Sequence, residues 1–241
     1  MGSNRSIIDI VVLTYNRPDY LRQTVGHILE RTRSPYALHV IDDASTDGET
    51  HDYLEGLLGD GKLASLLTRT ERAGMMANRN VASWLSFSDP FVLTDDDVLC
   101  PALEPDWLAR ATDAMLARPK MAVMALNHPG AYRIPYDQDD EVVYCEAVGC
   151  TFQFVRRYLA EAWHVAHYRN NWGVTDDVQR CCAARERGWH VGYMRSVYCY
   201  HIGVKSMLTP EREYGGRFIP VVSWDTLEPV DAENVNYRPV G

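Results

Sequence analysis

The chain has 241 residues, of which 46% are hydrophobic and 24% charged, as expected of a soluble globular protein with enough apolar sequence for one large α/β domain or two small ones. Its formal net charge of -9 and isoelectric point near 5.3 argue against a general nucleic-acid-binding protein and against a basic membrane-binding patch. No apolar run in the sequence approaches the roughly 20 residues that a membrane-spanning helix requires.

The first predicted element is a strand over residues 7–14, which has the nearly continuous apolar, β-branched character of a central parallel strand. Pro18 suits the start of a helix, and apolar residues at helical spacing extend this helix from residue 19 to residue 33. Pro35 ends it, and a second strand follows over residues 38–41. In such a β-α-β unit the right-handed crossover makes the polar residues at the two strand ends neighbours.

The next predicted elements are a helix over about residues 49–58, a short strand around residues 66–67 and a helix that begins near Gly74. Three arginines flank this last helical pattern, namely Arg69, Arg72 and Arg79. No Gly-x-Gly-x-x-Gly pattern follows the first strand, and the sequence has no Walker phosphate loop. A nicotinamide-binding domain is therefore not expected.

Three consecutive acids, Asp95, Asp96 and Asp97, follow a short apolar strand at residues 91–93. They would emerge at the carboxyl end of that strand, where open α/β sheets bind ligands. Carboxylates this close repel one another unless a positive charge lies between them. Mg²⁺ and Mn²⁺ favour carboxylate oxygens and leave positions for water and phosphate, so a metal site is one interpretation. A solvated acidic turn or a helix N-terminus is the other.

Beyond Pro101 the pattern predicts a helix over residues 106–118, a strand over residues 121–126 and a loop over residues 128–141 that would cover an acceptor cleft. Residues 204–241 contain scattered prolines and acids and are too irregular for a second domain. We expect this segment to form a lid, an acceptor-binding or partner-binding arm, or a partly disordered tail.

Asp176 and Asp177 begin the last predicted helix, which runs to Gly188. Thr175 can cap this helix, and acids in a first turn suit the helix dipole, so a structural interpretation explains the pair completely. His201 follows an apolar run near residue 197. A lone histidine in such a place is more often a surface or core residue than a ligand.

The six cysteines are Cys100, Cys145, Cys150, Cys181, Cys182 and Cys199, and none belongs to a Cys-x-x-Cys pair. This pattern favours reduced thiols buried as small hydrophobic residues over a disulfide framework or a zinc site. It predicts a cytoplasmic protein. The sequence also leaves open that the protein acts at a membrane surface through a partner.

Four segments in the correct order and spacing resemble the family 2 glycosyltransferases with the GT-A fold. They are the strand end at residues 11–18, the second-strand motif at residues 41–47, the Arg79-Asn80 pair, and Thr94-Asp95-Asp96-Asp97 in the place of the metal-binding Asp-x-Asp. The resemblance extends over about residues 7–206 and implies an α/β, Rossmann-like GT-A domain, with a mostly parallel twisted sheet and helices on both faces. The domain would comprise residues 1–203, followed by a C-terminal arm over residues 204–241.

The resemblance also implies the roles of individual residues. Those beside the nucleotide would be Thr14, Tyr15, Asn16, Arg17, Asp43, Arg79 and Asp95. Asp43 would accept a hydrogen bond from the imide N–H of uracil; an Asx-turn or helix cap is its structural alternative, and a solvated helix face is that of Arg79. The metal ligands would be Asp96, Asp97 and His201.

The acidic pair resembles the family's Glu-Asp pair, which precedes a glycine twelve residues after its first acid and then an edge strand. By this resemblance Asp177 is the general base and Asp176 stands in the place of the usual Glu. Thr94 likewise stands where the first acid of the Asp-x-Asp usually falls, which leaves open which of the three acids contacts metal directly. Residues 147–157 resemble the family's strand that leads through a Gly-rich turn into a helix.

The implied function is transfer of a sugar from a nucleotide donor, UDP-linked by preference, to the hydroxyl of a glycan, lipid-linked or small-molecule acceptor. Mn²⁺ or Mg²⁺ would bridge the donor phosphates, and Asp177 would deprotonate the acceptor and so invert the anomeric centre. Two alternatives stay open. One is a retaining glycosyltransferase or a nucleotidyltransferase on the same fold, and the other is a non-catalytic domain that binds a sugar nucleotide or a protein partner.

Overall fold

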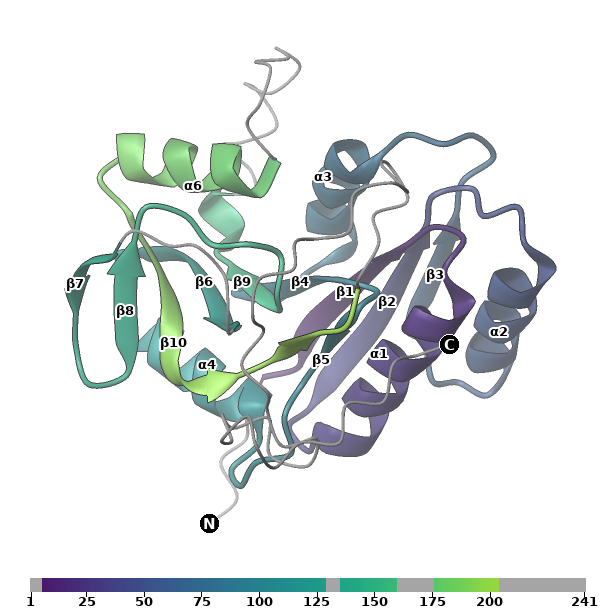
Figure 1. Ribbon diagram of the computed structural model, residues 1–241, viewed down its shortest axis with the longest axis horizontal. Helices are drawn as coiled ribbons and strands as arrows, with labels where there is room; N and C mark the ends of the chain where they lie inside the picture. Colours follow the sequence, from purple (N-terminus) through teal and green to yellow (C-terminus); the bar gives the residue numbers. More distant parts are fainter. Residues whose placement is uncertain (1–5, 129–134, 160–175, 204–241) are drawn as a thin grey trace, which may run out of the picture.

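The computed structural model describes residues 6–128, 135–159 and 176–203, in which strands alternate with helices (Figure 1). The strands are β1 (Ile8–Thr14), β2 (Tyr36–Asp42), β3 (Ser65–Thr68), β4 (Phe91–Asp95), β5 (Val98–Leu99), β6 (Met121–Asn127), β7 (Pro135–Gln138), β8 (Val142–Cys145), β9 (Gln153–Val155), β10 (His190–Tyr198) and β11 (Tyr200–His201). The helices are α1 (Pro18–Arg31), α2 (Gly48–Gly59), α3 (Met75–Leu85), α4 (Trp107–Leu116) and α6 (Asp176–Glu186). No helix of these segments is long and apolar enough to cross a bilayer.

Local chemistry sets where several helices begin. Pro18 occupies the first turn of α1, where its missing N–H and fixed φ cost nothing. Asp47 caps α2 by accepting a hydrogen bond from the Thr50 N–H (2.6 Å). Asp106 caps α4 in the same way, through the Ala109 N–H (2.8 Å). Each carboxylate satisfies an N–H that has no partner within its helix, so these helices start at the capped residue.

The large sheet has the strand order β3-β2-β1-β4-β9-β6-β10-β8-β7. Within it β1, β2, β3, β4, β6 and β10 run in the same direction, while β9 and β8 run against them. The register pairs Thr14 with Asp42 and Leu13 with Asp95, so β1, β2 and β4 end at the same edge. The predictions of a mostly parallel sheet and of neighbouring polar strand ends are therefore confirmed.

Two expectations about the second half of the sheet were wrong. The region expected to be a loop over residues 128–141 contains β7, which pairs with β8; residues 129–134 lie outside the described part. All four residues of β7 are exposed, so no apolar pattern marks this strand, which is ordered by pairing with β8. The strand after Gly188 is not at an edge, because β10 lies between β6 and β8.

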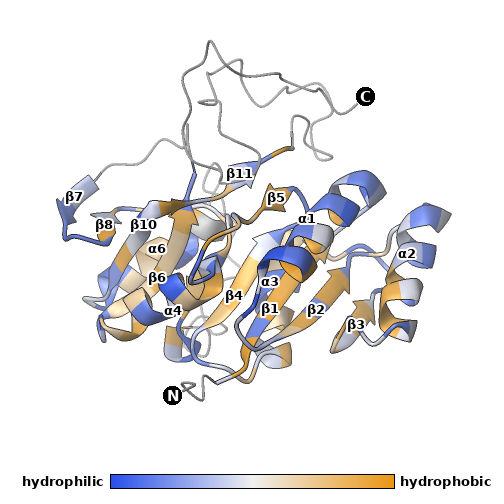
Figure 2. Cartoon of the chain, turned by 90° about the horizontal axis from the view of Figure 1, so that it is seen from below, coloured by the Kyte–Doolittle hydropathy of each residue, from blue (hydrophilic) through white to orange (hydrophobic). Residues whose placement is uncertain are grey.

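Helices cover both faces of the sheet, as the sequence predicts (Figure 1). Ile10 and Val12 of β1 point into a core shared with α1, α2 and α4. Val11 and Leu13 point the other way, into a core shared with α3 and α6. Figure 2 shows the interior strands largely in the hydrophobic colour, and every residue of β1 is buried, as expected of a strand covered on both faces. Five of the six cysteines are buried among these residues.

A buried contact between a carboxylate and an imidazole joins β1 to its neighbours. Asp9, only 6% exposed, contacts His39 Nε2 of β2 at 3.1 Å through one carboxylate oxygen. Its other oxygen accepts the N–H groups of Phe87 (2.6 Å) and Ser88 (2.8 Å). Burial by itself would raise the pKa of Asp9, but the hydrogen bonds and the histidine outweigh burial and lower this pKa to about 2.

We expect Asp9→Asn to lower the free energy of unfolding at pH 7 by about 2 kcal/mol, because it removes a charge that the folded state stabilises. The contribution of Asp9 is complete above its ordinary pKa of 3.8 and is lost as the pH falls toward about 2. The difference between variant and wild type should therefore narrow over that range. Urea unfolding across it provides the measurement, with exposed Asp52→Asn as control. The same difference at every pH would show that Asp9 does not titrate as described.

Candidate active site

The three acids lie where β4 ends. Asp95 is the last residue of β4, and Asp96 and Asp97 form the turn that leads into β5. The short strand β5 pairs antiparallel with β11, which sets Val98 opposite His201. The Ile202 N–H also donates to the Asp97 carbonyl (2.8 Å). Residues about a hundred positions apart thus meet at the carboxyl edge of the sheet, the edge at which the sequence predicted a ligand site.

Arg17 lies between two of these carboxylates. Its Nη1 is 3.1 Å from Asp96 Oδ1, and its Nη2 is 2.6 Å from Asp97 Oδ2. The second oxygen of Asp96 accepts a hydrogen bond from Thr14 Oγ1 (2.7 Å). Asp96 and Asp97 are only 3% and 5% exposed, so their charges are balanced by this guanidinium rather than by water.

The other two partners of the acids come from α3 and β11. The Arg79 side chain is 2% exposed and places Nη2 at 2.9 and 3.2 Å from the two oxygens of Asp95. His201 Nε2 lies 3.3 Å from Asp97 Oδ1. The predicted site residues Thr14, Arg17, Arg79, Asp95, Asp96, Asp97 and His201 therefore form one connected cluster.

Burial and charge push the pKa values in this cluster apart. Burial raises the pKa of Asp96, and the Asp97 carboxylate adds to the rise against the opposing charge of Arg17. Burial acts on Asp97 as well, but His201 and Arg17 outweigh it and hold the pKa of Asp97 below its usual range. The pKa of His201 is raised, because the Asp97 charge outweighs burial.

The side chains of this cluster are of the kinds that bind a divalent cation. Two carboxylates lie on either side of the Arg17 guanidinium, with an imidazole next to them, and Mn²⁺ and Mg²⁺ accept such ligands. Among the described residues, no group of three or more His, Cys, Asp or Glu side chains is arranged to hold a metal. Arg17 occupies the position between Asp96 and Asp97. Metal ligation by Asp96, Asp97 and His201 stays a prediction.

Asp43 lies on the nucleotide side predicted from the sequence, at the end of β2. It is 6% exposed, and its two oxygens accept the N–H groups of Ala73 (2.8 Å) and Gly74 (2.9 Å). It thereby fixes the loop before α3, and Arg72 Nε lies 3.8 Å away. Each carboxylate oxygen has a second lone pair, so this anchoring leaves acceptor capacity for a ligand N–H.

Asn16 joins the loops that follow β1 and β2. Its backbone has a φ of 51°, in the left-handed region that asparagine tolerates. Its Oδ1 accepts the N–H groups of Thr46 (2.7 Å) and Asp47 (3.3 Å). The neighbouring Tyr15 carries the Arg72 guanidinium 4.1 Å from its ring centre. Tyr15 and Asn16 thus help to shape the same sheet edge as Asp43.

The predicted base lies at the start of α6. This helix begins at Asp176, so Asp176 and Asp177 occupy its first turn, while their side chains and Thr175 lie outside the described structure. One turn later, Arg180 is fully buried and donates to Gln153 Oε1 of β9. Arg180 was not predicted, because an arginine one turn after two acids is typical of a solvated helix face.

Two further residues of the cluster were missed. The His128 ring lies 5.6 Å from the His201 ring, edge to face, at the end of β6. Gly203 packs directly on the acids, because a Cβ built there would overlap Asp97 Oδ2 and lie 2.8 Å from Arg17 Nη2. His128 carries no motif of its own, whereas the need for glycine at residue 203 arises only from tertiary packing.

We therefore expect Gly203→Ala to lower the free energy of unfolding by about 1–3 kcal/mol, the usual cost of overpacking. The added methyl must displace the Asp97 carboxylate, which is 5% exposed, or the Arg17 guanidinium, and so disturb the contact between them. Thermal or urea unfolding measures the change. Gly56→Ala on α2 is the comparison variant: a Cβ there meets nothing within 4 Å, so this change should leave stability unchanged or raise it by up to about 1 kcal/mol. Equal stability of Gly203→Ala and wild type would contradict the packing described.

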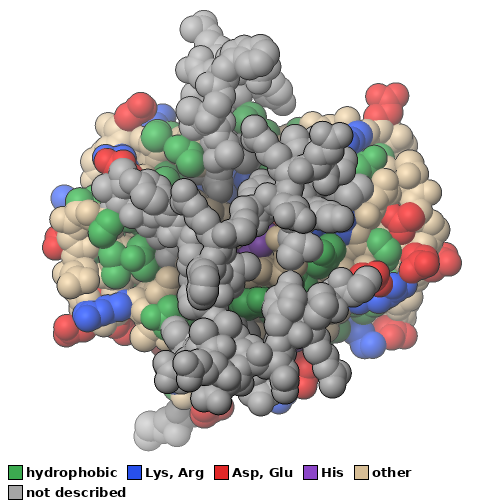
Figure 3. Space-filling model, in the orientation of Figure 1, with side chains coloured by type: hydrophobic (Ala, Val, Ile, Leu, Met, Phe, Trp, Pro, Cys, Tyr) green, Lys and Arg blue, Asp and Glu red, His purple; other side chains and the backbone are tan. Residues whose placement is uncertain are grey.

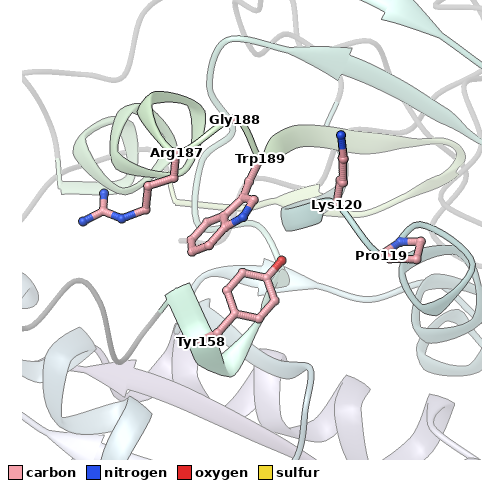
Figure 4. A pocket seen from close by; sticks show the side chains of 6 residues that line it. All are labelled: Pro119, Lys120, Tyr158, Arg187, Gly188 and Trp189. Carbon is pink, nitrogen blue, oxygen red and sulfur yellow. The ribbon is translucent and has the colours of Figure 1, made fainter.

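A separate pocket of about 530 Å³ lies away from this cluster. Its lining consists of Pro119, Lys120, Tyr158, Arg187, Gly188 and Trp189 (Figure 4). Lys120 and Trp189 immediately precede β6 and β10, so the pocket is at the amino ends of these strands, opposite the acids. Over the described residues in view, Figure 3 shows acidic and basic side chains interspersed, with no surface of one charge.

The candidate active site is the acid cluster at the end of β4, because the charges of Asp96 and Asp97 are buried and lie at the carboxyl edge of the sheet.

Comparison with known proteins identifies both a family and a fold. A family model described as Glycosyl transferase family 2 matches residues 9–190. Among solved structures, the mannosyltransferase PcManGT from Pyrobaculum calidifontis, in complex with GDP-Man and Mn²⁺, superposes with a TM-score of 0.62 at 21% identity. GalNAc-T7 with UDP, GalNAc and Mn²⁺ gives 0.66 at 13% identity, and S. aureus TarS 1-349 gives 0.59 at 16%.

These similarities cover most of this chain but only part of the others. The match to PcManGT covers 83% of this chain and 57% of that one. The match to GalNAc-T7 covers 83% and 44%, and the match to TarS 1-349 covers 81% and 60%. At these identities the structural matches establish the fold alone, and they confirm the GT-A architecture expected from the sequence.

Proposed function

Because the chain belongs to glycosyl transferase family 2 and is a glycosyltransferase, we propose that it transfers a sugar from a UDP-linked donor to an acceptor hydroxyl, with inversion at the anomeric carbon. The observation that carries the proposal is the cluster of Asp95, Asp96 and Asp97 with its two arginines, placed where β1, β2 and β4 end together. Two similar structures contain UDP, which supports the choice of nucleotide.

The donor nucleotide would lie along this sheet edge. Asp43 would accept the imide N–H of uracil, the role that its position at the end of β2 and its spare lone pairs support. Tyr15 and Asn16 would border the same space. Arg79, already paired with Asp95, would hold that acid toward the ribose. Arginine also provides a planar fork that suits phosphate oxygens.

A divalent cation would be held by Asp96, Asp97 and His201. PcManGT and GalNAc-T7 were solved with Mn²⁺, which supports this choice of cofactor. When bound, such an ion neutralises the charge that develops on the nucleoside diphosphate as it leaves. The protein's own part is to hold an ionised carboxylate in a buried place, and the charges of His201 and Arg17 do this for Asp97.

Asp177 would take the proton of the acceptor hydroxyl. The first turn of α6 favours an ionised acid there, because the positive end of the helix dipole stabilises its charge. An ionised carboxylate is the form that can accept a proton. Attack by the deprotonated oxygen on the face opposite the leaving diphosphate gives inversion in a single displacement. Asp176 would be the second acid in this turn, next to the base.

The experiment is a screen of UDP- and GDP-sugars for release of nucleoside diphosphate, with Mn²⁺ and with a chelator. We expect release from one UDP-sugar, dependent on metal and increased by an acceptor, with an inverted product by NMR. A retained configuration would identify a retaining transferase. Formation of a UDP-sugar from UTP and a sugar phosphate would identify a nucleotidyltransferase. UDP binding without any release would identify a sugar-nucleotide-binding domain.

A further inference from the structure

One guanidinium holds both carboxylates of the proposed metal site. Arg17 contacts Asp96 at 3.1 Å and Asp97 at 2.6 Å, and its side chain is only 15% exposed. Its guanidinium carbon also lies 4.4 Å from the centre of the Tyr20 ring. Gly203 closes the arrangement from the other side. Arg17 is therefore a fixed part of the acid cluster and not a side chain that happens to pass near it.

The carboxylate oxygens of this pair are all engaged. Asp96 uses one oxygen for Thr14 and the other for Arg17. Asp97 uses one for Arg17 and the other for His201. Mg²⁺ binds oxygen ligands at about 2.0–2.1 Å, closer than any of these contacts, and brings two positive charges. An ion that touched both acids would occupy the space of the guanidinium and repel it.

We propose that Arg17 and the divalent cation compete for the Asp96–Asp97 pair, so that metal binds only when the guanidinium leaves its position between the two carboxylates. This inference rests on the proposed metal site. In the metal-free protein Arg17 balances two buried acids that would otherwise repel each other. The arginine is thus a resident counter-ion, and its removal increases the negative potential available to a metal.

The displaced guanidinium needs a new partner, and a donor diphosphate provides one. Arg17 immediately precedes Pro18 of α1, so its backbone stays in place while the side chain turns. Arginine binds phosphate oxygens through the same planar fork that binds carboxylates. A donor that captures Arg17 stabilises the metal-accepting arrangement, so metal and donor bind cooperatively. By linkage, each then raises the affinity of the other by the same factor.

The test is the affinity for Mn²⁺ alone, measured by calorimetry or by the EPR signal of free Mn²⁺, with and without UDP. In wild type we expect weak binding that UDP strengthens by about 5–150-fold, the usual range of such coupling. Arg17→Gln should bind Mn²⁺ at least about 5-fold more tightly without UDP and lose most of the coupling. Arg22→Gln, an exposed arginine on the same helix, is the matched control and should behave as wild type.

A second variant protects the test against loss of folding. Arg17→Lys keeps a positive charge but cannot bridge two carboxylates, so it should bind Mn²⁺ with an affinity between those of wild type and Arg17→Gln. Mn²⁺ should also raise the melting temperature of either variant more than that of wild type. Unchanged or weaker Mn²⁺ binding in both variants would overturn the competition. Absence of Mn²⁺ binding in every protein, with UDP bound, would instead reject the proposed metal site.

Discussion

Replacing Asp177 by Asn is expected to lower the rate of sugar transfer on the order of 10²–10⁴-fold, the usual contribution of general acid–base catalysis. The substitution keeps the size of the side chain and its place in the first turn of α6, but removes the group that accepts the acceptor's proton. Donor binding should be nearly unchanged, because the proposed base acts on the acceptor hydroxyl and not on the nucleotide. Stability should fall by only about 0.3–1 kcal/mol, from a weaker interaction with the helix dipole.

Three measurements separate the possible roles of this acidic pair. Steady-state transfer, UDP affinity and melting temperature are compared for Asp177→Asn and Asp176→Asn. Loss of transfer in Asp176→Asn alone, with unfolding of Asp177→Asn, would mean that the base and the structural acid were assigned the wrong way round. Wild-type transfer in both variants would mean that the pair only caps α6 and that the base lies elsewhere.

Asp96→Asn should abolish the Mn²⁺-dependent part of UDP binding and reduce transfer on the order of 10²–10³-fold, because loss of charge stabilisation at the leaving group costs several kcal/mol. Asn keeps the volume of Asp96 and an oxygen that can accept from Thr14, and Arg17 keeps its contact with Asp97. The fold should therefore persist. Calorimetry with UDP, with and without Mn²⁺, gives the direct measurement.

Two further variants show how much each residue contributes to metal binding. His201→Ala should weaken the same metal-linked binding by less, since it removes one ligand of several, and exposed Asp52→Asn should leave it unchanged. If UDP binds Asp96→Asn with the metal dependence of wild type, Asp96 is not a ligand. Its contacts with Thr14 and Arg17 would then be its whole role.

The sequence was sufficient for the features that depend on neighbouring residues. Apolar runs located β1, β2, β4 and β6, and the Asp-rich turn after β4 pointed to the site. Strand β7 was missed because its four residues are exposed and obtain their order from pairing with β8. The interior position of β10 was also missed, because it depends on pairing with β8, which is not visible in the sequence around β10.

The physics of the acid cluster was predictable, but its partners were not. Three adjacent carboxylates require positive charge, and the acidic turn by itself predicted either a metal ion or a solvated turn. The structure shows that Arg17, just before α1, and Arg79, within α3, contact these acids. Nothing in the local pattern around either arginine indicates which acid it meets. Such pairings depend on contacts between residues far apart in sequence, and these become visible only once the sheet is assembled.

The pairing of β5 with β11 also constrains the order of folding. Strands β1, β2 and β4 can associate once residues 8–95 are present, whereas His201 reaches Asp97 only after the chain has returned from β10 to β5. Closing so long a stretch costs more entropy and takes longer than pairing neighbouring segments. In refolding, far-ultraviolet circular dichroism should thus recover before nucleotide binding does. A transfer assay would then detect only molecules in which β11 has paired with β5. A spectroscopic assay of strand content would also detect molecules in which this pairing has not yet formed.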